Sequence, residues 1–154
     1  MPGVDDGLLP LALACLQVWC GEPVTPAGPA GPYTPWVEPH SLLAAGMPAA
    51  AAVAALPDPP PGLLMEALWV LAGNAALAVG DAVVLARARD ALAPAAGELA
   101  GAGSGMLTAG PVADHLAEWD RRLGGGGRAE PDSGAGPAAG PTRGGGVADP
   151  AVPG

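Results

Sequence analysis

Isoleucine, phenylalanine and lysine are absent from the sequence, and asparagine and tyrosine occur once each, at Asn74 and Tyr33. Alanine, glycine and proline make up 80 of the 154 residues. The leucines, valines, methionines and tryptophans, 39 residues in all, must therefore supply nearly all of a core. Such a chain can form only one modest domain. The scarce residue types have AT-rich codons, which indicates a GC-rich genome of a bacterium, a phage or a large DNA virus.

Positive charge is also scarce, because six arginines face 15 acidic residues and the net charge is −9. Binding to a nucleic-acid backbone requires several cations on one face, and the arginines are too few and too scattered to provide one. We therefore expect no nucleic-acid partner. Anionic lipid headgroups are disfavoured for the same reason.

The side chains that carry most enzyme chemistry are few and far apart. His40 and His115 lie 75 positions apart, and neither has the spacing to a cysteine that a metal site requires. No serine has a nucleophile-elbow context, and the glycine-rich run 101–105 has no lysine to accompany it as a phosphate loop. We expect no enzyme activity, no catalytic residues, no metal, no cofactor and no small-molecule substrate.

Two cysteines, Cys15 and Cys20, are the only thiols. On a helix, residues five positions apart point about 140° away from each other. A disulfide between them is therefore not expected, and two buried reduced thiols are the simplest interpretation. Lipidation of either cysteine and pairing between molecules remain open alternatives.

The apolar stretch 8–20 has the composition of a secretory signal, but its flanks do not. Asp5 and Asp6 precede it where a signal peptide carries positive charge, and the run 12–15, Ala-Leu-Ala-Cys, is an imperfect lipobox. We expect the protein to stay in the cytoplasm, or in the host cytoplasm if it is viral.

The first half of the chain is divided by proline. Asp5 or Asp6 can cap a helix over 8–20, which Gly21 would end. Six prolines between positions 21 and 40 predict an extended proline-rich loop over 21–40, with Trp36 holding it to the core.

Two short helices are expected before the next break. Ser41 can cap a helix over 42–45, and a second piece should follow over 48–56. The run Asp-Pro-Pro-Pro-Gly at 58–62 cannot continue a helix, so residues 57–62 are predicted to be a linker.

The second half should contain one long helix and one shorter helix. Residues 63–90 contain no proline and are dominated by Ala, Leu and Val, which predicts one continuous central helix. Glycines fragment the chain over 101–110, and a last helix is expected over 111–124. From 124 to 154, 16 of 31 residues are Gly or Pro, which predicts a disordered acidic tail. The fold class is thus all-α, a small irregular helical bundle over residues 1–123 around one long helix.

The predicted long helix permits two environments. A span over 64–86 is apolar enough to be a membrane candidate, but Asn74 and Asp81 interrupt it. A central Asp costs about 3 kcal/mol in a bilayer, roughly what six Leu or Val residues gain. Because its polar and small residues form a narrow stripe, we expect this helix to be buried inside the bundle. A membrane location is the alternative.

The last predicted helix has the clearest amphipathic pattern. Its apolar residues fall at i, i+4, i+7 and i+11, and they are Val112, Leu116, Trp119 and Leu123. Glu118 and Arg122 can form a favourable i, i+4 pair on the same helix. This apolar stripe either packs on the long helix as core or is offered to another protein as a helix-in-groove motif. Its four residues are the candidate partner-binding residues.

These features favour a non-catalytic accessory or structural protein that acts through protein–protein contacts. The partner is an unknown protein or a second copy of the same chain. The alternative is a single-span membrane protein with residues 64–86 in the bilayer.

Overall fold

The computed structural model describes residues 6–125, which are helical with connecting turns and loops and contain no named strand. Its α-helices are α1 (Leu8–Cys20), α2 (Thr34–Ala44), α3 (Ala50–Ala54), α4 (Met65–Val79), α5 (Ala82–Leu92) and α6 (Val112–Gly125). Three short 3-10 turns, Gly31–Tyr33, Ala93–Ala95 and Ala102–Ser104, complete the order. The prediction of an all-α chain is confirmed for this part of the sequence.

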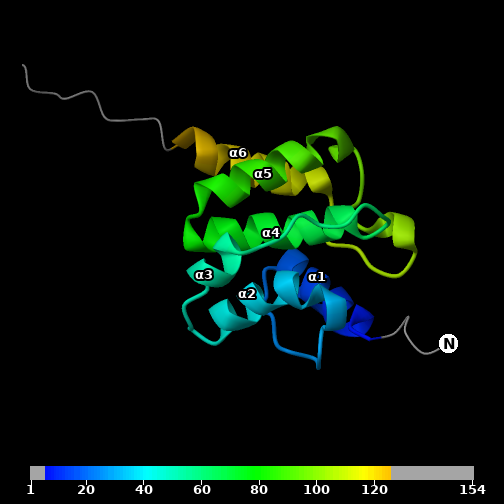
Figure 1. Cartoon of the computed structure of the whole chain (residues 1–154). Helices are drawn as coiled ribbons and strands as arrows, with labels where there is room; N and C mark the ends of the chain where they lie inside the picture. Colours follow the sequence, from blue (N-terminus) through cyan, green and yellow to red (C-terminus); the bar gives the residue numbers. More distant parts are fainter. Residues whose placement is uncertain (1–5, 126–154) are drawn as a thin grey trace, which may run out of the picture.

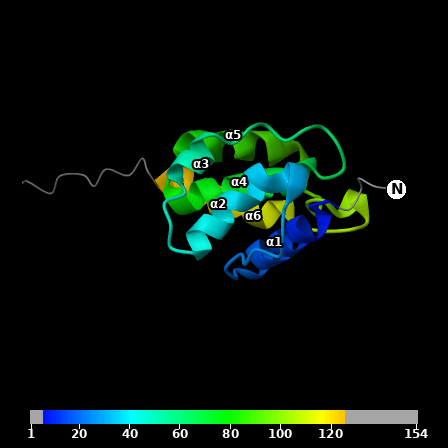
Figure 2. The same cartoon turned by 60° about the horizontal axis from the view of Figure 1, so that its bottom comes forward.

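The α4 helix is the centre of the domain and contacts each of the other five α-helices (Figure 1). In Figures 1 and 2, α5 and α1 lie on opposite sides of α4. Nine of its residues are buried, and they cover every side of the helix between Ala67 and Ala76 except at Asn74. The expected burial inside a bundle therefore holds for this part of the predicted 63–90 helix.

The prediction of a single long helix over 63–90 is wrong, because the chain turns back at Gly80. Gly80 adopts a left-handed conformation with φ 79°, which an L side chain would strain, and it ends α4. Asp81 then caps α5 by accepting bonds from the backbone N–H groups of Val83 and Val84 at 3.1 and 3.0 Å. A glycine stop followed directly by an N-cap overrides the apolar composition, and α4 and α5 form a helical hairpin.

The candidate membrane segment 64–86 is therefore shared between the two arms of this hairpin and its turn. Within residues 6–125, none of the helices has both the length and the apolar character needed to cross a bilayer.

The proline-rich segment 21–40 is only partly extended, because α2 begins at Thr34. Pro35 lies in the first turn of α2, where a missing N–H costs little. Pro39 lies inside the helix and removes one helical hydrogen bond, but Pro39 is itself buried. Trp36 is buried as expected, at 5% exposure, and anchors the segment. Its burial, together with that of its neighbours, stabilises a helix that the proline spacing argues against.

The two short helices predicted after this segment also differ from the structure. Ser41 is inside α2, where its hydroxyl donates to the Val37 carbonyl at 3.4 Å, and it caps no separate helix. The second piece, expected over 48–56, is the short α3. Residues 57–62, the predicted linker, contain no α-helix.

The glycine-rich segment 101–110 is an ordered loop. Ala100 donates to the Gly110 carbonyl and Ala109 donates to the Ala100 carbonyl, each at 2.9 Å. These bonds close the loop beside the isolated bridge between Leu99 and Pro111. At the other end of α6, the helix continues to Gly125, one residue beyond the predicted start of the tail at 124. The rest of the predicted tail, 126–154, lies outside the described residues.

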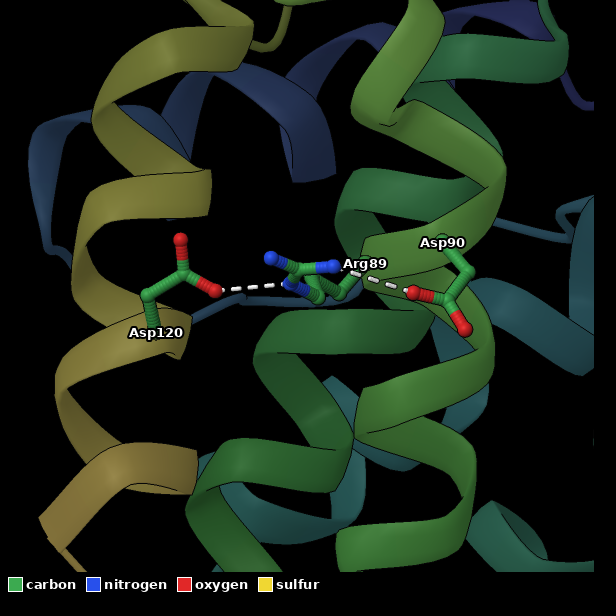
Figure 3. A network of polar contacts seen from close by, with 3 residues as sticks. All are labelled: Arg89, Asp90 and Asp120. Carbon is green, nitrogen blue, oxygen red and sulfur yellow. Dashed lines mark hydrogen bonds and ion pairs between the residues drawn. The ribbon is translucent and has the colours of Figure 1, made fainter.

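Arginine side chains on α5 hold neighbouring segments in place. Arg87 pairs with Asp58 at 3.2 Å and donates to the Leu56 carbonyl at 2.8 Å, which ties the proline linker to α5. Arg89 donates to Asp120 of α6 at 2.7 Å and to Asp90 at 3.1 Å (Figure 3). These hydrogen bonds, the one to Asp120 first, raise the pKa of Arg89. The pairs Arg87–Asp58 and Arg89–Asp120 are largely exposed, so they orient the segments more than they stabilise the fold.

The α4 and α6 helices pack closely at Gly73. A Cβ atom on Gly73 would lie 2.3 Å from the ring of Trp119, which is fully buried. We predict that Gly73→Ala lowers the free energy of unfolding by roughly 2 kcal/mol, because the ring must shift in a packed core. Urea denaturation, monitored by tryptophan fluorescence, measures this free energy of unfolding.

Gly97→Ala is the matched control, because nothing lies within 4 Å of a Cβ atom there. Equal stability of the two variants would contradict the packing of Trp119 on Gly73.

The hairpin turn can be tested at its cap. We predict that Asp81→Ala costs about 1 kcal/mol, because two backbone N–H groups of α5 lose their acceptor. Asp81→Asn retains a capping oxygen and should stay within about 0.5 kcal/mol of the wild type. Thermal unfolding followed by circular dichroism compares the wild type with the two variants. An Asp81→Asn variant as unstable as Asp81→Ala would contradict the capping role.

Candidate functional site

Three polar side chains at the contact between α4 and α6 bond one another. Asn74 of α4 donates to the Val70 carbonyl at 3.0 Å and to Nδ1 of His115 at 3.2 Å, and its oxygen accepts from Nε1 of Trp119 at 3.4 Å. His115 donates from Nε2 to the Ala109 carbonyl at 2.8 Å, so the ring is a neutral tautomer with its proton on Nε2. This network joins α4, α6 and the 101–110 loop.

Other polar side chains at the hairpin also bond within the domain: Trp119 donates to Asn74, Arg87 pairs with Asp58, and Asp81 caps α5. Glu118 pairs with Arg121, three residues on, and not with Arg122 as predicted.

His40 is the other histidine, and α2 holds it against α4. It is 7% exposed, and its Nε2 donates to the Leu71 carbonyl at 2.8 Å. Burial lowers the pKa of His40 below its ordinary value of 6.5, against a smaller opposite effect of the bond to Leu71. One edge of the ring lines a groove of about 380 Å³ with Glu22. The histidine is a neutral donor that ties α2 to the central helix.

The two cysteines are unpaired and differ in environment. Cys15 is fully buried, and burial raises the pKa of its thiol to about 12, which makes it unreactive at neutral pH. Cys20 is exposed, which corrects the expectation that both thiols are buried. Within residues 6–125, no group of three or more His, Cys, Asp and Glu side chains is arranged to hold a metal ion.

Two residues of the predicted partner face of α6 are buried and two are half-buried. Val112 and Trp119 are fully buried in the core, so these two side chains are not accessible to another protein. Leu116 and Leu123 are half-buried against that core. Val112 and Trp119, the first and third residues of the stripe, thus contact the core of this chain. Of the two interpretations of this stripe, packing as core accounts for Val112 and Trp119.

Leu123 also lines a groove of about 440 Å³ at the end of the hairpin. The groove lies between the α4–α5 turn and the last turn of α6, with Leu77, Val79 and Leu85 among its apolar walls and Arg122 as its charged residue.

The N-terminal helix α1 has its inner side in the core and its ends defined by glycine. Leu11, Ala14 and Cys15 are buried at i, i+3 and i+4. Gly21, with φ 71°, ends the helix and donates to the Val18 carbonyl at 3.1 Å. No charged residue occurs between Asp6 and Glu22.

The outer side of α1 is apolar as well. Leu9 is 64% exposed, Leu16 47% and Trp19 47%, and Met106 of the neighbouring loop is 57% exposed beside Leu9. Trp19 keeps its place by lying on Gly110, where a Cβ atom would be 2.5 Å from the indole. Figures 1 and 2 show α1 at the edge of the domain. Within one helix of 13 residues, the outward side therefore offers apolar contacts and no charge.

A regular spacing runs along this outer side: Leu9, Leu13, Leu16 and Cys20 fall at i, i+4, i+7 and i+11, and we call these four residues the α1 seam. Leu13 is half-buried and the other three are exposed. The spacing is identical to that of the stripe on α6, and it is the spacing at which one helix packs along another. In α6 the partner helix belongs to the same domain, whereas in α1 the described residues leave the seam uncovered.

Comparison with known proteins yields no match: neither a protein-family model, nor a curated protein, nor a solved structure is significantly similar to this chain.

The α1 seam is the candidate site, and we did not predict it from the sequence. The signal was present, because Leu9, Leu13, Leu16 and Cys20 repeat the spacing that marked α6. However, α1 is apolar on nearly every side, so no polar face indicated which residues point outward. The structure resolves this by burying Leu11, Ala14 and Cys15.

The buried His40 predicts a pH dependence of stability. Its folded pKa lies below its unfolded value, so the unfolded chain binds the proton more readily, and stability is complete above pH 6.5 and falls as the pH is lowered. We predict that the difference in free energy of unfolding between wild type and His40→Gln declines below pH 6.5, by at most about 1.4 kcal/mol per pH unit. Denaturant titrations from pH 8 to pH 5 measure this difference.

The difference should be constant above pH 7, which serves as the internal control, because every group other than residue 40 is the same in both proteins and cancels. A difference that grows on acidification would contradict the burial of neutral His40.

Proposed function

We propose that this protein is a non-catalytic accessory or structural component that acts through protein–protein contact, with the α1 seam as its contact surface. The observation that carries the proposal is the continuous apolar outer side of α1. Single exposed apolar residues are ordinary on protein surfaces, whereas a contiguous set on one helix is typical of an interaction site. Leu9, Leu16, Trp19 and Met106 form such a set.

Trp19 and Met106 suit a contact surface for a second reason. Tryptophan is enriched among the residues that dominate binding energy, and methionine adapts its shape to different partners. Trp19 is also held on Gly110, so little conformational freedom is lost when a partner covers it. The partner is therefore an apolar helix or groove that accommodates an indole and leucines.

The internal chemistry supports the same function. Asn74, His115, Trp119 and His40 are occupied in bonds that hold helices together, as the hydrogen bonds above show. From the predicted α6 stripe, only Leu116 and Leu123 keep enough exposure to add to a contact.

The proposal can be tested with a photo-crosslinking amino acid placed at position 16 in the cells that produce the protein. We expect a discrete crosslinked protein from position 16, and its loss when Leu9→Glu is added, because the charge would have to be buried at the contact. Immunoblotting followed by mass spectrometry identifies the species.

Position 83 is the matched control, because Val83 is an apolar residue on α5 that is 77% exposed. No crosslink from position 16, or the same crosslinks from positions 16 and 83, would contradict the proposal.

A further inference from the structure

We infer that the groove between the end of α1 and α2 binds a primary ammonium group, with His40 accepting an N–H from it and Glu22 pairing with its charge. This groove of about 380 Å³ is a different surface from the α1 seam, so the inference goes beyond the proposed function. Its volume is within the range of small-ligand sites, roughly 300–1,000 Å³. The ammonium belongs to a free alkylamine or to a lysine of another protein, since this sequence contains no lysine.

His40 supplies a hydrogen-bond acceptor in the groove. Its side chain is more than nine-tenths buried, and its Nε2 donates to the Leu71 carbonyl at 2.8 Å. A neutral imidazole that donates from Nε2 has a lone pair on Nδ1. Within residues 6–125, Nδ1 is not paired, and the fully buried polar side-chain atom without a partner is Nε1 of Trp36, not Nδ1 of His40. Nδ1 therefore reaches open space, and the open space that His40 lines is this groove.

The ring keeps this lone pair at neutral pH. Burial lowers the pKa of His40 below 6.5, against a smaller opposite effect of the bond to Leu71, so the ring is uncharged at pH 7. A neutral acceptor does not repel a cation, and it is satisfied by a ligand that donates an N–H. An anion has no proton to give to Nδ1 and would lie near the carboxylate of Glu22.

Glu22 supplies the charge that complements an ammonium. It is the one charged residue among the described residues that line the groove, and it is exposed. Its backbone N–H donates to the Gln17 carbonyl at 2.8 Å. The side chain of Gln17 also bonds Thr25 twice, to the hydroxyl at 2.9 Å and from the backbone N–H at 3.2 Å. These bonds hold the loop that carries Glu22 against α1, so little ordering is needed when a ligand binds.

The apolar walls determine the rest of the ligand. Val18, Val24 and Leu43 line the same groove, and an alkyl chain beside the ammonium would leave water by covering them. A bare inorganic cation gains nothing from such walls. A zinc ion takes at least three protein ligands, and within residues 6–125 no group of three His, Cys, Asp and Glu side chains is arranged to supply them. The groove therefore suits an alkylammonium.

NMR titration of the full chain, labelled with ¹⁵N-histidine, tests the inference near neutral pH with n-butylammonium chloride. We expect a saturable shift of the His40 Nδ1 resonance, with a dissociation constant on the order of 1–10 mM for so small a ligand. His115 is the internal control, because both of its ring nitrogens are already bonded, to Asn74 and to the Ala109 carbonyl. Correlations between ring and backbone assign the two histidines.

A charge variant and a second cation test the two contacts separately. Glu22→Gln should weaken binding at least about fivefold, because it removes the charge that pairs with the ammonium. Glu38→Gln removes an exposed acid of α2 that lines a different groove, and it should leave binding within about twofold of wild type. Tetramethylammonium carries the charge but no N–H, so it should bind wild type at least about fivefold more weakly than n-butylammonium.

The two sources of the ammonium are distinguished with Nα-acetyl-lysine methylamide. Binding at least as tight as that of n-butylammonium indicates a lysine of another protein, because the groove then accommodates the attached backbone. Weaker binding indicates a free alkylamine.

Three results would overturn the inference. One is the lack of a saturable His40 shift up to about 100 mM n-butylammonium, and another is an equal shift of His40 and His115. The third is binding of tetramethylammonium within about twofold of n-butylammonium, which is measured on the wild type and so does not depend on the folding of a variant. A folded Glu22→Gln variant that binds like wild type would likewise contradict the pairing with Glu22.

Discussion

The close approach of helices to α4 is the constraint on which the rest of this structure depends. With so few bulky residues, the chain cannot fill wide gaps between helices, so the helices must lie close to one another. Gly73 and the alanines of α4 permit this, and the largest fully buried side chain, Trp119, fills the space that Gly73 leaves. Asn74 is next to Gly73 and accepts from the indole nitrogen, so the polar atom of Trp119 is satisfied at the same contact.

This arrangement explains which parts of the fold could be predicted from the sequence. The absence of β-alternation and the presence of apolar helical periodicity were sufficient for the all-α class, and Gly21 ends the first helix as predicted. The α4–α5 hairpin was missed because one long buried helix and two shorter packed helices can have the same composition. What separates them is a two-residue signal, Gly80 followed by Asp81, in which a left-handed stop is joined to a cap. Averages over a long apolar window conceal such a signal.

The candidate site shows a different limit of prediction. Spacing identifies which residues share one side of a helix, but it does not say what lies opposite that side. The stripes on α1 and α6 have the same spacing, and the sequence favoured α6 because its polar side made the pattern visible. In the folded chain, the α6 stripe contributes Val112 and Trp119 to the core, whereas α1 buries the other side of its helix, at Leu11, Ala14 and Cys15. The clear polar and apolar sides of α6 thus indicated a stripe that packs in the core. In α1, which has no such contrast, the exposed stripe could not be recognised.

The distribution of charge connects these two observations. The described arginines on α5, Arg87 and Arg89, are engaged with Asp58 and with Asp120 and Asp90. Between Asp6 and Glu22, α1 carries no charged residue, so covering its outward side removes no ion from water. Covering a charged surface costs the hydration of its ions, whereas covering an apolar surface gains free energy. A contact is therefore favoured where charge is missing. The composition that limits the core to one small domain thereby leaves an apolar helix at its edge, and under the proposed function that helix is the contact surface.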